Sequence, residues 1–258
     1  MKVVIFAGGR GTRISEESVL RPKPMIAIGG KPILWHIMKT YAAHGHNEFI
    51  ICLGYKGWMI KEYFINYYLH NANLTVDLKD NSVEIHDNFA EPFKITLVET
   101  GLDTMTAGRL RRVLPYTNGE PFMLTYGDGV SNVDIGTLLD FHRQSGRICT
   151  MTAIQATSRF GVIRMDEAGG ISSFEEKPAD SGTWINGGFF VLNPEIKDYL
   201  HAGADDMMRE RQPMDDLARD HEIAAYRHHD FWKAMDTIRD KEELEAMWES
   251  GKADWKIW

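Results

Sequence analysis

A glycine-rich turn and the basic segment that follows it are the strongest signs of chemistry in this sequence. Residues 8–13 read GGRGTR, and residues 21–24 read RPKP. Because glycines carry no side chain, the backbone N–H groups of such a turn can approach phosphate oxygens closely, while Arg13 and Lys23 add positive charge. We therefore expect a polyphosphate site here, and a surface turn beside a basic loop is the alternative.

Two familiar phosphate-binding motifs are not found in the sequence. Ile14 stands where the dinucleotide-binding pattern requires its third glycine. No segment matches the GxxxxGK[ST] pattern of the P-loop. The turn at 8–13 is therefore neither a dinucleotide-binding fingerprint nor a P-loop.

Two aspartates far apart in the sequence are candidate metal ligands. Asp128 lies in a Gly-Asp-Gly turn after the apolar segment 122–126, and Asp236 lies in the segment AMDT at 234–237. Mg²⁺ commonly takes one or two carboxylates together with phosphate oxygens and water. Their sequence context does not show that the two aspartates meet in the fold. An aspartate in a glycine-rich turn also more often serves only to form the turn, by bonding to its own backbone.

A series of motifs follows the order found in one enzyme family. The motifs are AGGRGTR, RPKP, GGKPILWHIM, GYKG, TYGDGV, FEEKP, NGGFFV and FWKAMDT, and they cover nearly the whole chain. On these motifs the chain resembles the sugar-phosphate nucleotidyltransferases, or NDP-sugar pyrophosphorylases. The resemblance implies Mg²⁺-dependent transfer of a nucleotidyl group from a nucleoside triphosphate to a sugar 1-phosphate, with release of pyrophosphate.

Three stretches of the chain bear on the substrates. They resemble the members of the family that use CTP and glucose 1-phosphate, which implies these two partners. The stretches are DTMTAGRLRRV, YGDGVS, and FWKAMDTIRDK together with the tail KADWKIW. One departure is Gln212 before Pro213, where that pattern has a glutamate. The alternatives are the same chemistry with another sugar or with UTP or dTTP, and a non-catalytic nucleotide-sensing module of the same fold.

The resemblance also assigns roles to individual residues. It places catalysis on Arg13, Lys23, Asp128 and Asp236, the two aspartates being the metal ligands. The nucleotide-binding positions are Ala7, Gly8, Gly9, Gly11, Thr12, Arg13, Lys23, Thr104, Gly108, Arg109, Gly127 and Asp128. The sugar-phosphate positions are Tyr126, Glu175, Lys177, Asn186 and Gly187, and Trp184 is a second candidate wall beside Tyr126, although buried aromatic residues more often belong to the core.

The expected reaction needs no general base. A phosphate monoester is largely a dianion near neutral pH because its second pKa is about 6. We therefore expect a direct in-line displacement at the α-phosphorus, in which Mg²⁺, Arg13 and Lys23 neutralise charge and Lys177 orients the sugar phosphate.

Apolar segments and helical periods alternate over the first 150 residues. We expect strands at 3–7, 49–53, 122–126, 148–154, 183–192 and 223–226, with hairpins in 74–99 and 161–176. We expect helices at 32–43, 60–69, 109–114, 135–142, 213–219 and 239–248, and one starting near Pro194. This alternation predicts an α/β fold with a Rossmann-like, doubly wound, mostly parallel sheet and a small β-rich sugar-binding and C-terminal part.

The length favours a single domain over residues 1–258. We expect residues 1–130 to be its nucleotide-binding half, and residues 131–258 its sugar-binding half and C-terminal tail. The role of the 74–99 insertion is open.

Charge and cysteine content restrict the partners and the compartment. The 29 basic and 37 acidic residues give a net charge of −8, so an anionic substrate needs a local basic pocket, and nucleic acid is not an expected partner. Cys52 and Cys149 lie in apolar runs and are expected to be buried rather than disulfide-bonded. No segment suits a signal peptide or a membrane span, so we expect a cytoplasmic protein.

Aromatic residues gather at the end of the chain. Trp248, Trp255 and Trp258 suggest a terminus that folds back or lies in a subunit contact, and a homo-oligomer is therefore expected. The pairs His44/His46 and His228/His229 have no cysteine or carboxylate at zinc-ligand spacing, so structural histidines are the favoured interpretation.

Overall fold

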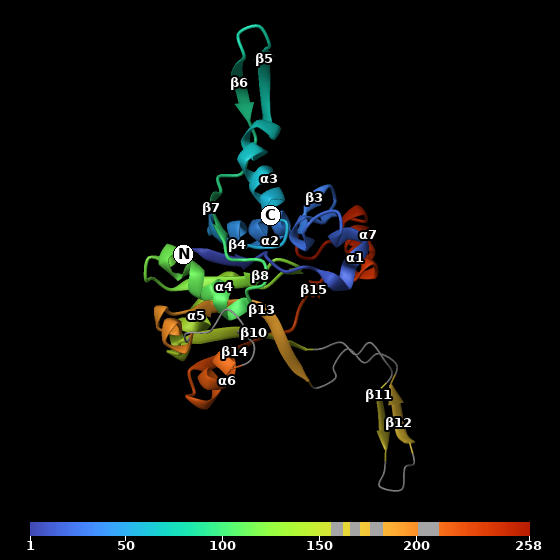
Figure 1. Cartoon of the computed structure of the whole chain (residues 1–258). Coiled ribbons are helices and arrows are strands. Elements are labelled where there is room, and N and C mark those ends of the chain that lie inside the picture. Colours follow the sequence, from blue (N-terminus) through green and yellow to red (C-terminus); the bar gives the residue numbers. More distant parts are fainter. Residues whose placement is uncertain (156–161, 166–170, 176–182, 201–211) are drawn as a thin grey trace.

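A seven-stranded sheet forms the centre of the computed structural model, which describes residues 1–155, 162–165, 171–175, 183–200 and 212–258 (Figure 1). The strands lie in the order β14-β10-β13-β8-β1-β4-β7. Their bounds are β1 (Val3–Phe6), β4 (Glu48–Leu53), β7 (Lys94–Glu99), β8 (Phe122–Tyr126), β10 (Cys149–Gln155), β13 (Trp184–Leu192) and β14 (Ile223–His228). Strands from both halves of the sequence therefore share one sheet.

Most neighbouring strands of this sheet are parallel. β1 pairs in parallel with β4 and β8, β4 with β7, and β10 with β14, whereas β13 is antiparallel to β8 and β10. Phe6 lies opposite Cys52 of β4 and Tyr126 of β8, so these three strands end together. The turns that follow them meet at one sheet edge, which is where doubly wound folds bind their ligands.

Helices cover both faces of the sheet. Val3 and Ile5 pack into one core cluster, and Val4 and Phe6 into a second, because successive strand residues point to opposite faces. The first cluster includes apolar residues of α2 (Ile33–Ala43), α5 (Ile135–Ser145) and α7 (Ile238–Glu249); the second includes those of α4 (Thr106–Val113), η4 (Pro194–Tyr199) and α6 (Gln212–Arg219). This arrangement confirms the predicted Rossmann-like, doubly wound α/β fold.

Several short elements were not predicted from the sequence. They are η1 (Thr12–Ile14), α1 (Ser15–Ser18), η2 (Lys23–Met25), η3 (Leu114–Thr117), β2 (Ala27–Ile28), β3 (Lys31–Pro32), β9 (Gly129–Ser131) and β15 (Trp232–Ala234). β2 pairs with β3, and β15 pairs with β9, both antiparallel. The β9–β15 ribbon joins parts of the chain that are far apart in sequence.

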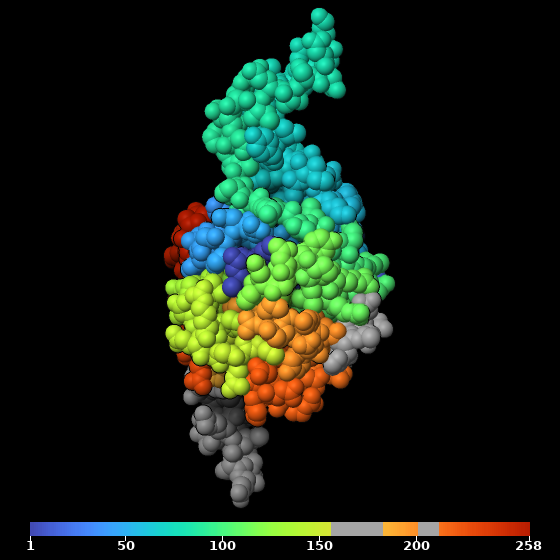
Figure 2. Space-filling model, turned by 90° about the vertical axis from the view of Figure 1, so that its left-hand side faces the viewer, coloured from blue at the N-terminus to red at the C-terminus, as the bar shows by residue number. Residues whose placement is uncertain are grey.

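A long arm projects from the body of the molecule (Figures 1 and 2). It consists of the outer part of α3 (Gly57–His70) and a two-stranded ribbon, β5 (Ala72–Asp77) with β6 (Ser82–Asn88). Leu74 lies opposite Ile85, and Val76 opposite Val83, so these four side chains share one face of the ribbon. Val76 is 49% exposed and Val83 is 52% exposed. The arm therefore presents an apolar face to solvent.

The segment 74–99 contains two structures rather than one insertion. The predicted hairpin is confirmed by β5 and β6, but Lys94–Glu99 forms β7 and extends the central sheet beside β4. β7 is an edge strand in which Val98 alone is buried, so it lacks the continuous apolar run that marks β1 and β4.

The remaining predicted elements agree closely with the structure. The ribbon predicted at 161–176 forms as β11 (Val162–Met165) and β12 (Ile171–Glu175). The helix expected after Pro194 is the 3-10 helix η4. Among the helices that the structure describes, none combines the length and apolar character that crossing a bilayer requires.

Candidate active site

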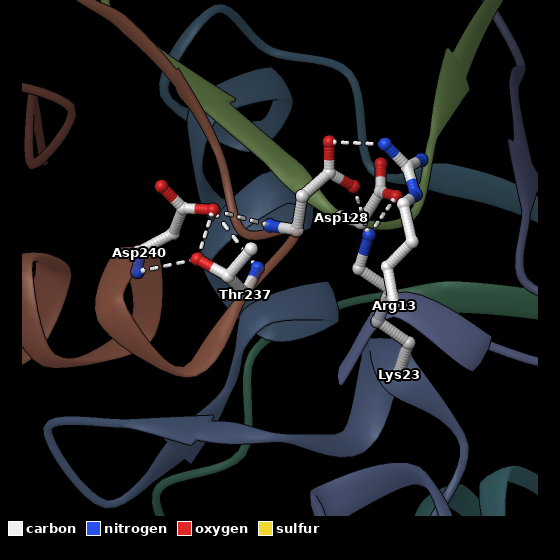
Figure 3. Close-up of polar contacts among 6 residues, drawn as sticks. Arg13, Lys23, Asp128, Thr237 and Asp240 are labelled. Atoms are coloured by element: carbon white, nitrogen blue, oxygen red, sulfur yellow. Dashed lines mark hydrogen bonds and ion pairs between the residues drawn. The ribbon is translucent and has the colours of Figure 1, made fainter. Parts of the chain in front are cut away.

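Three charged residues from distant parts of the chain meet at the sheet edge. Lys23 Nζ donates to Asp128 Oδ2 and to Asp236 Oδ1, each over 2.7 Å (Figure 3). The lysine is only 7% exposed. The two carboxylates predicted as metal ligands are therefore brought together by one buried ammonium group.

Backbone pairing explains how the two aspartates come together. Asp128 follows β8 and precedes β9, while Asp236 follows β15. Gly129 lies opposite Ala234 in the β9–β15 ribbon, and Met235 N donates to Asp128 O over 2.9 Å. The ribbon therefore places the two aspartates next to each other through backbone contacts alone.

The start of α7 holds Asp236 from the other side. Thr237 caps this helix, its side chain accepting from Asp240 N, and Asp240 Oδ2 accepts from the backbone N–H groups of Asp236 and Thr237 (Figure 3). Burial acts to raise the pKa of Asp240, but the hydrogen bonds from Thr237 and Asp236 outweigh it and lower that pKa. Arg13 Nη1 donates to Asp236 Oδ2 over 2.8 Å, so the second predicted cation joins the same cluster.

The glycine turn opens into a pocket of about 620 Å³ beside this cluster. Gly11 has a φ of +64°, a left-handed conformation that glycine adopts without strain. The pocket is lined by residues 6–14, by Lys23 and Pro24, by residues 102–106 with Arg109, and by residues 126–128. Ala7, Thr12 and Thr104, which we expect to bind the nucleotide, line this pocket, whereas Gly108 is buried within α4.

Arg109 lines the pocket but is tied to the protein frame. Its guanidinium donates to Gly8 O, Leu53 O and Thr100 Oγ1 over 2.7 to 3.1 Å. A Cβ atom at Gly8 would lie 2.0 Å from Arg109 Nη1. The first glycine of the motif therefore makes room for an arginine that holds together the ends of β1, β4 and β7.

Predicted sugar-phosphate residues lie on the other side of β8. Asn186 Nδ2 donates to Tyr126 Oη over 3.1 Å, and Asn186 Oδ1 accepts from Gly188 N over 2.9 Å. Trp232 Nε1 donates to Gly187 O over 2.6 Å, which connects β13 to β15. Trp184 packs against His229 and Arg227.

Two of the predicted sugar-phosphate residues cannot be placed by their side chains. Glu175 ends strand β12, and only its backbone is described. Lys177 lies outside the described residues.

Sequence comparison identifies the family. Residues 2–249 match the family model described as nucleotidyl transferase. The chain belongs to the nucleotidyl transferase family.

Individual members of the nucleotidyl transferase family match over the full length. The chain is 51% identical over 259 residues to a glucose-1-phosphate cytidylyltransferase of Salmonella typhi, covering 100% of both chains. It is 46% identical to the "probable glucose-1-phosphate cytidylyltransferase" of Bacillus subtilis, again over 100% of both. The solved structure of HddC from Yersinia pseudotuberculosis complexed with GMP-PN matches with a TM-score of 0.68 at 23% identity, covering 96% of this chain and 99% of that one, and supports the fold.

The carboxylate pair of this nucleotidyl transferase suits a divalent cation. Asp128 and Asp236 already converge on one positive charge, the Lys23 ammonium, which shows that their oxygens can serve a common cation. In the part of the chain that the structure describes, no group of three or more histidine, cysteine, aspartate or glutamate residues could hold a metal. Two carboxylates suffice for Mg²⁺ where phosphate oxygens and water complete its shell.

Sequence reasoning missed two residues at the pocket mouth. Arg10, in the glycine turn, forms a 2.7 Å ion pair with Asp103, in the loop between β7 and α4. Arg10 lies inside the GGRGTR motif, so the sequence could have identified it as a candidate phosphate-binding residue. Asp103 carries no motif of its own, and its contact with Arg10 depends on the tertiary fold.

Proposed function

We propose that this nucleotidyl transferase transfers the cytidylyl group of CTP to α-D-glucose 1-phosphate, giving CDP-glucose and pyrophosphate. The observation that carries the proposal is the convergence of Lys23, Asp128 and Asp236 beside a glycine-lined pocket. The choice of CTP and glucose 1-phosphate is supported by the name of the Salmonella typhi relative, which is 51% identical over its full length.

The proposed cofactor is Mg²⁺, held by Asp128 and Asp236. When bound, it would neutralise charge on the phosphate oxygens of the triphosphate. Lys23 keeps the two carboxylates together, and Arg13 donates to Oδ2 of Asp236, the oxygen that Lys23 does not contact. Both cations are thereby positioned beside the glycine turn, where a polyphosphate would lie.

The residues of the chain supply position and charge rather than proton transfer. An oxygen of the sugar phosphate dianion attacks the α-phosphorus in line with the departing pyrophosphate, and no side chain needs to accept a proton. The amides of the glycine turn, Arg13 and Lys23 stabilise the charge that builds up on the phosphates. Lys177 is proposed to orient the phosphate of the sugar, with Glu175, Asn186 and Gly187 at its hydroxyl groups.

The two halves of the chain are proposed to divide the substrates. Among the residues that the structure describes, those that line the pocket all fall between positions 6 and 128, which supports residues 1–130 as the nucleotide-binding half. Tyr126, Asn186 and Gly187 lie next to one another through β8 and β13, which supports residues 131–258 as the main source of sugar contacts.

A panel of nucleotides tests the proposed substrate pair. The protein is incubated with Mg²⁺, glucose 1-phosphate and CTP, UTP, dTTP, ATP or GTP in turn, and pyrophosphate release is measured. Release with CTP alone is the expected result, because only cytosine among the pyrimidines presents an exocyclic amino donor that the site can select. Release with UTP or dTTP instead would show that the protein uses a different base from the one proposed. No pyrophosphate release with any of the triphosphates would favour a nucleotide-sensing module.

We also propose a cytoplasmic homo-oligomer. Cys52 and Cys149 are both buried thiols, which suits a reducing compartment. An isolated two-stranded ribbon is marginally stable in water, so the apolar face of the arm is proposed to be covered by a second copy of the chain. Light scattering should give a multimer for the wild type and a smaller species for Val76→Lys/Val83→Glu, and an unchanged mass would remove the arm from the interface.

A further inference from the structure

Arg10 and Asp103 face each other across the mouth of the pocket. Arg10 Nη2 lies 2.7 Å from Asp103 Oδ1, and both residues line the pocket. Arg10 belongs to the glycine turn after β1, whereas Asp103 belongs to the loop between β7 and α4. The ion pair therefore connects two loops that line the pocket.

The other cations of the pocket already have partners that belong to the site or to the frame. Lys23 is held by the two proposed metal ligands, and Arg13 by one of them. Arg109 donates to backbone carbonyls and to a threonine hydroxyl. Arg10 differs, because its carboxylate partner takes no part in the carboxylate pair and is 81% exposed.

We infer that Arg10 is a further triphosphate-binding residue, which exchanges the Asp103 carboxylate for phosphate oxygens when the nucleotide enters. This inference rests on the proposed function, since it requires a nucleoside triphosphate in the pocket. An ion pair between two exposed side chains contributes little stability, so breaking it costs little. A guanidinium binds phosphate with paired hydrogen bonds, which makes the exchange favourable. Asp103 then acts as an internal competitor of the triphosphate.

Competition predicts effects of opposite sign from the two partners. Arg10→Gln should raise the Kd for CTP roughly tenfold, because a hydrogen bond to a charged group is lost. Asp103→Asn should lower that Kd about two- to threefold, because the competing carboxylate is gone. In the Arg10→Gln background, Asp103→Asn should have less effect than in the wild type, since the two residues act through one contact. Arg10→Lys should regain part of the affinity.

The test measures Kd by calorimetry for CTP with Mg²⁺ and for cytidine, which lacks phosphates. The expected result is opposite shifts for CTP, with the Kd for cytidine unchanged in every variant and thermal unfolding unchanged as well. An unchanged Kd for CTP in Arg10→Gln would overturn the inference. Weaker binding of both CTP and cytidine in both variants would also overturn the inference, because that result would mean that the ion pair only stabilises the shape of the pocket. Pyrophosphate release by the wild type tests the proposed function separately, so the two failures can be told apart.

Discussion

The carboxylates of Asp128 and Asp236 accept hydrogen bonds from the same atom, Lys23 Nζ, at equal distances of 2.7 Å. The residues are held by different elements, yet the backbone bond from Met235 N to Asp128 O keeps them adjacent. Two carboxylates this close repel each other unless a cation lies between them. Lys23 therefore organises the site as well as supplying charge to the substrate.

Replacing Lys23 should abolish most turnover. Lys23→Ala leaves the two carboxylates without their shared cation and removes a preorganised charge from the triphosphate. We expect kcat/KM for CTP to fall ~100-fold or more, the scale for losing one such contact. Steady-state pyrophosphate release measures this. Lys79→Ala, at the exposed tip of the arm, is the control, and normal turnover in Lys23→Ala would refute the assignment.

Gly8 and Gly9 should respond differently to a methyl group. A Cβ at Gly8 meets the Arg109 guanidinium at 2.0 Å, whereas one at Gly9 has no neighbour within 4 Å. Gly8→Ala must displace Arg109 from its hydrogen bonds to β1 and β4, so it should lower the unfolding temperature by several degrees, equivalent to about 1–3 kcal/mol. Gly9→Ala should unfold at the wild-type temperature. Equal unfolding temperatures for the two variants would show that Arg109 moves aside freely.

Trp232 should affect the sugar phosphate more than the nucleotide. Trp232→Phe keeps an aromatic ring but removes the donor to Gly187 O, so the segment beside Asn186 loses a support. We expect the KM for glucose 1-phosphate to rise about two- to tenfold, corresponding to the ~0.5–1.5 kcal/mol of one hydrogen bond, with the KM for CTP unchanged. Trp58→Phe, an exposed residue of α3, is the matched control. A change confined to the KM for CTP would place the effect elsewhere.

His36 should make the fold sensitive to acid. Burial lowers the pKa of His36 to about 4, although the hydrogen bond with Ile28 O acts in the opposite direction. In the unfolded chain the histidine pKa is near 6.5, so between about pH 6.5 and pH 4 His36 is protonated when unfolded but neutral when folded. The free energy of unfolding therefore falls as the pH drops through this range, by about 3 kcal/mol for this residue.

Denaturant unfolding at pH 7 and pH 4.5 tests this contribution. His36→Gln has no proton to bind, so its free energy of unfolding should depend less on pH than that of the wild type. His70→Gln, at the exposed end of α3, should retain the wild-type dependence. The same pH dependence in all three proteins would mean that other groups control acid stability.

The central fold could be predicted because its strands are buried on both faces. All four residues of β1 are buried, and such runs are visible without any tertiary knowledge. β7 was missed because an edge strand is only partly buried. The β9–β15 ribbon was missed because three-residue strands have no measurable periodicity.

The site was less accessible to residue-level reasoning. Lys23, Asp128 and Asp236 were candidates from their sequence context, but only the resemblance assigned them to one site, since no local pattern could pair positions more than a hundred residues apart. Arg109 was expected at the nucleotide, whereas the structure shows that its guanidinium also braces three strand ends. That role depends on the approach of Gly8 to α4, which only the tertiary fold determines.

Metal binding tests the central claim most directly. Mn²⁺ is titrated into the protein, and the free ion is followed by electron paramagnetic resonance. We expect the wild type to bind Mn²⁺, and Asp128→Asn and Asp236→Asn each to bind it roughly tenfold more weakly or worse. Asp140→Asn, at an exposed position of α5, should behave as the wild type. Undiminished Mn²⁺ binding in both site variants would contradict the account that these two carboxylates hold the metal.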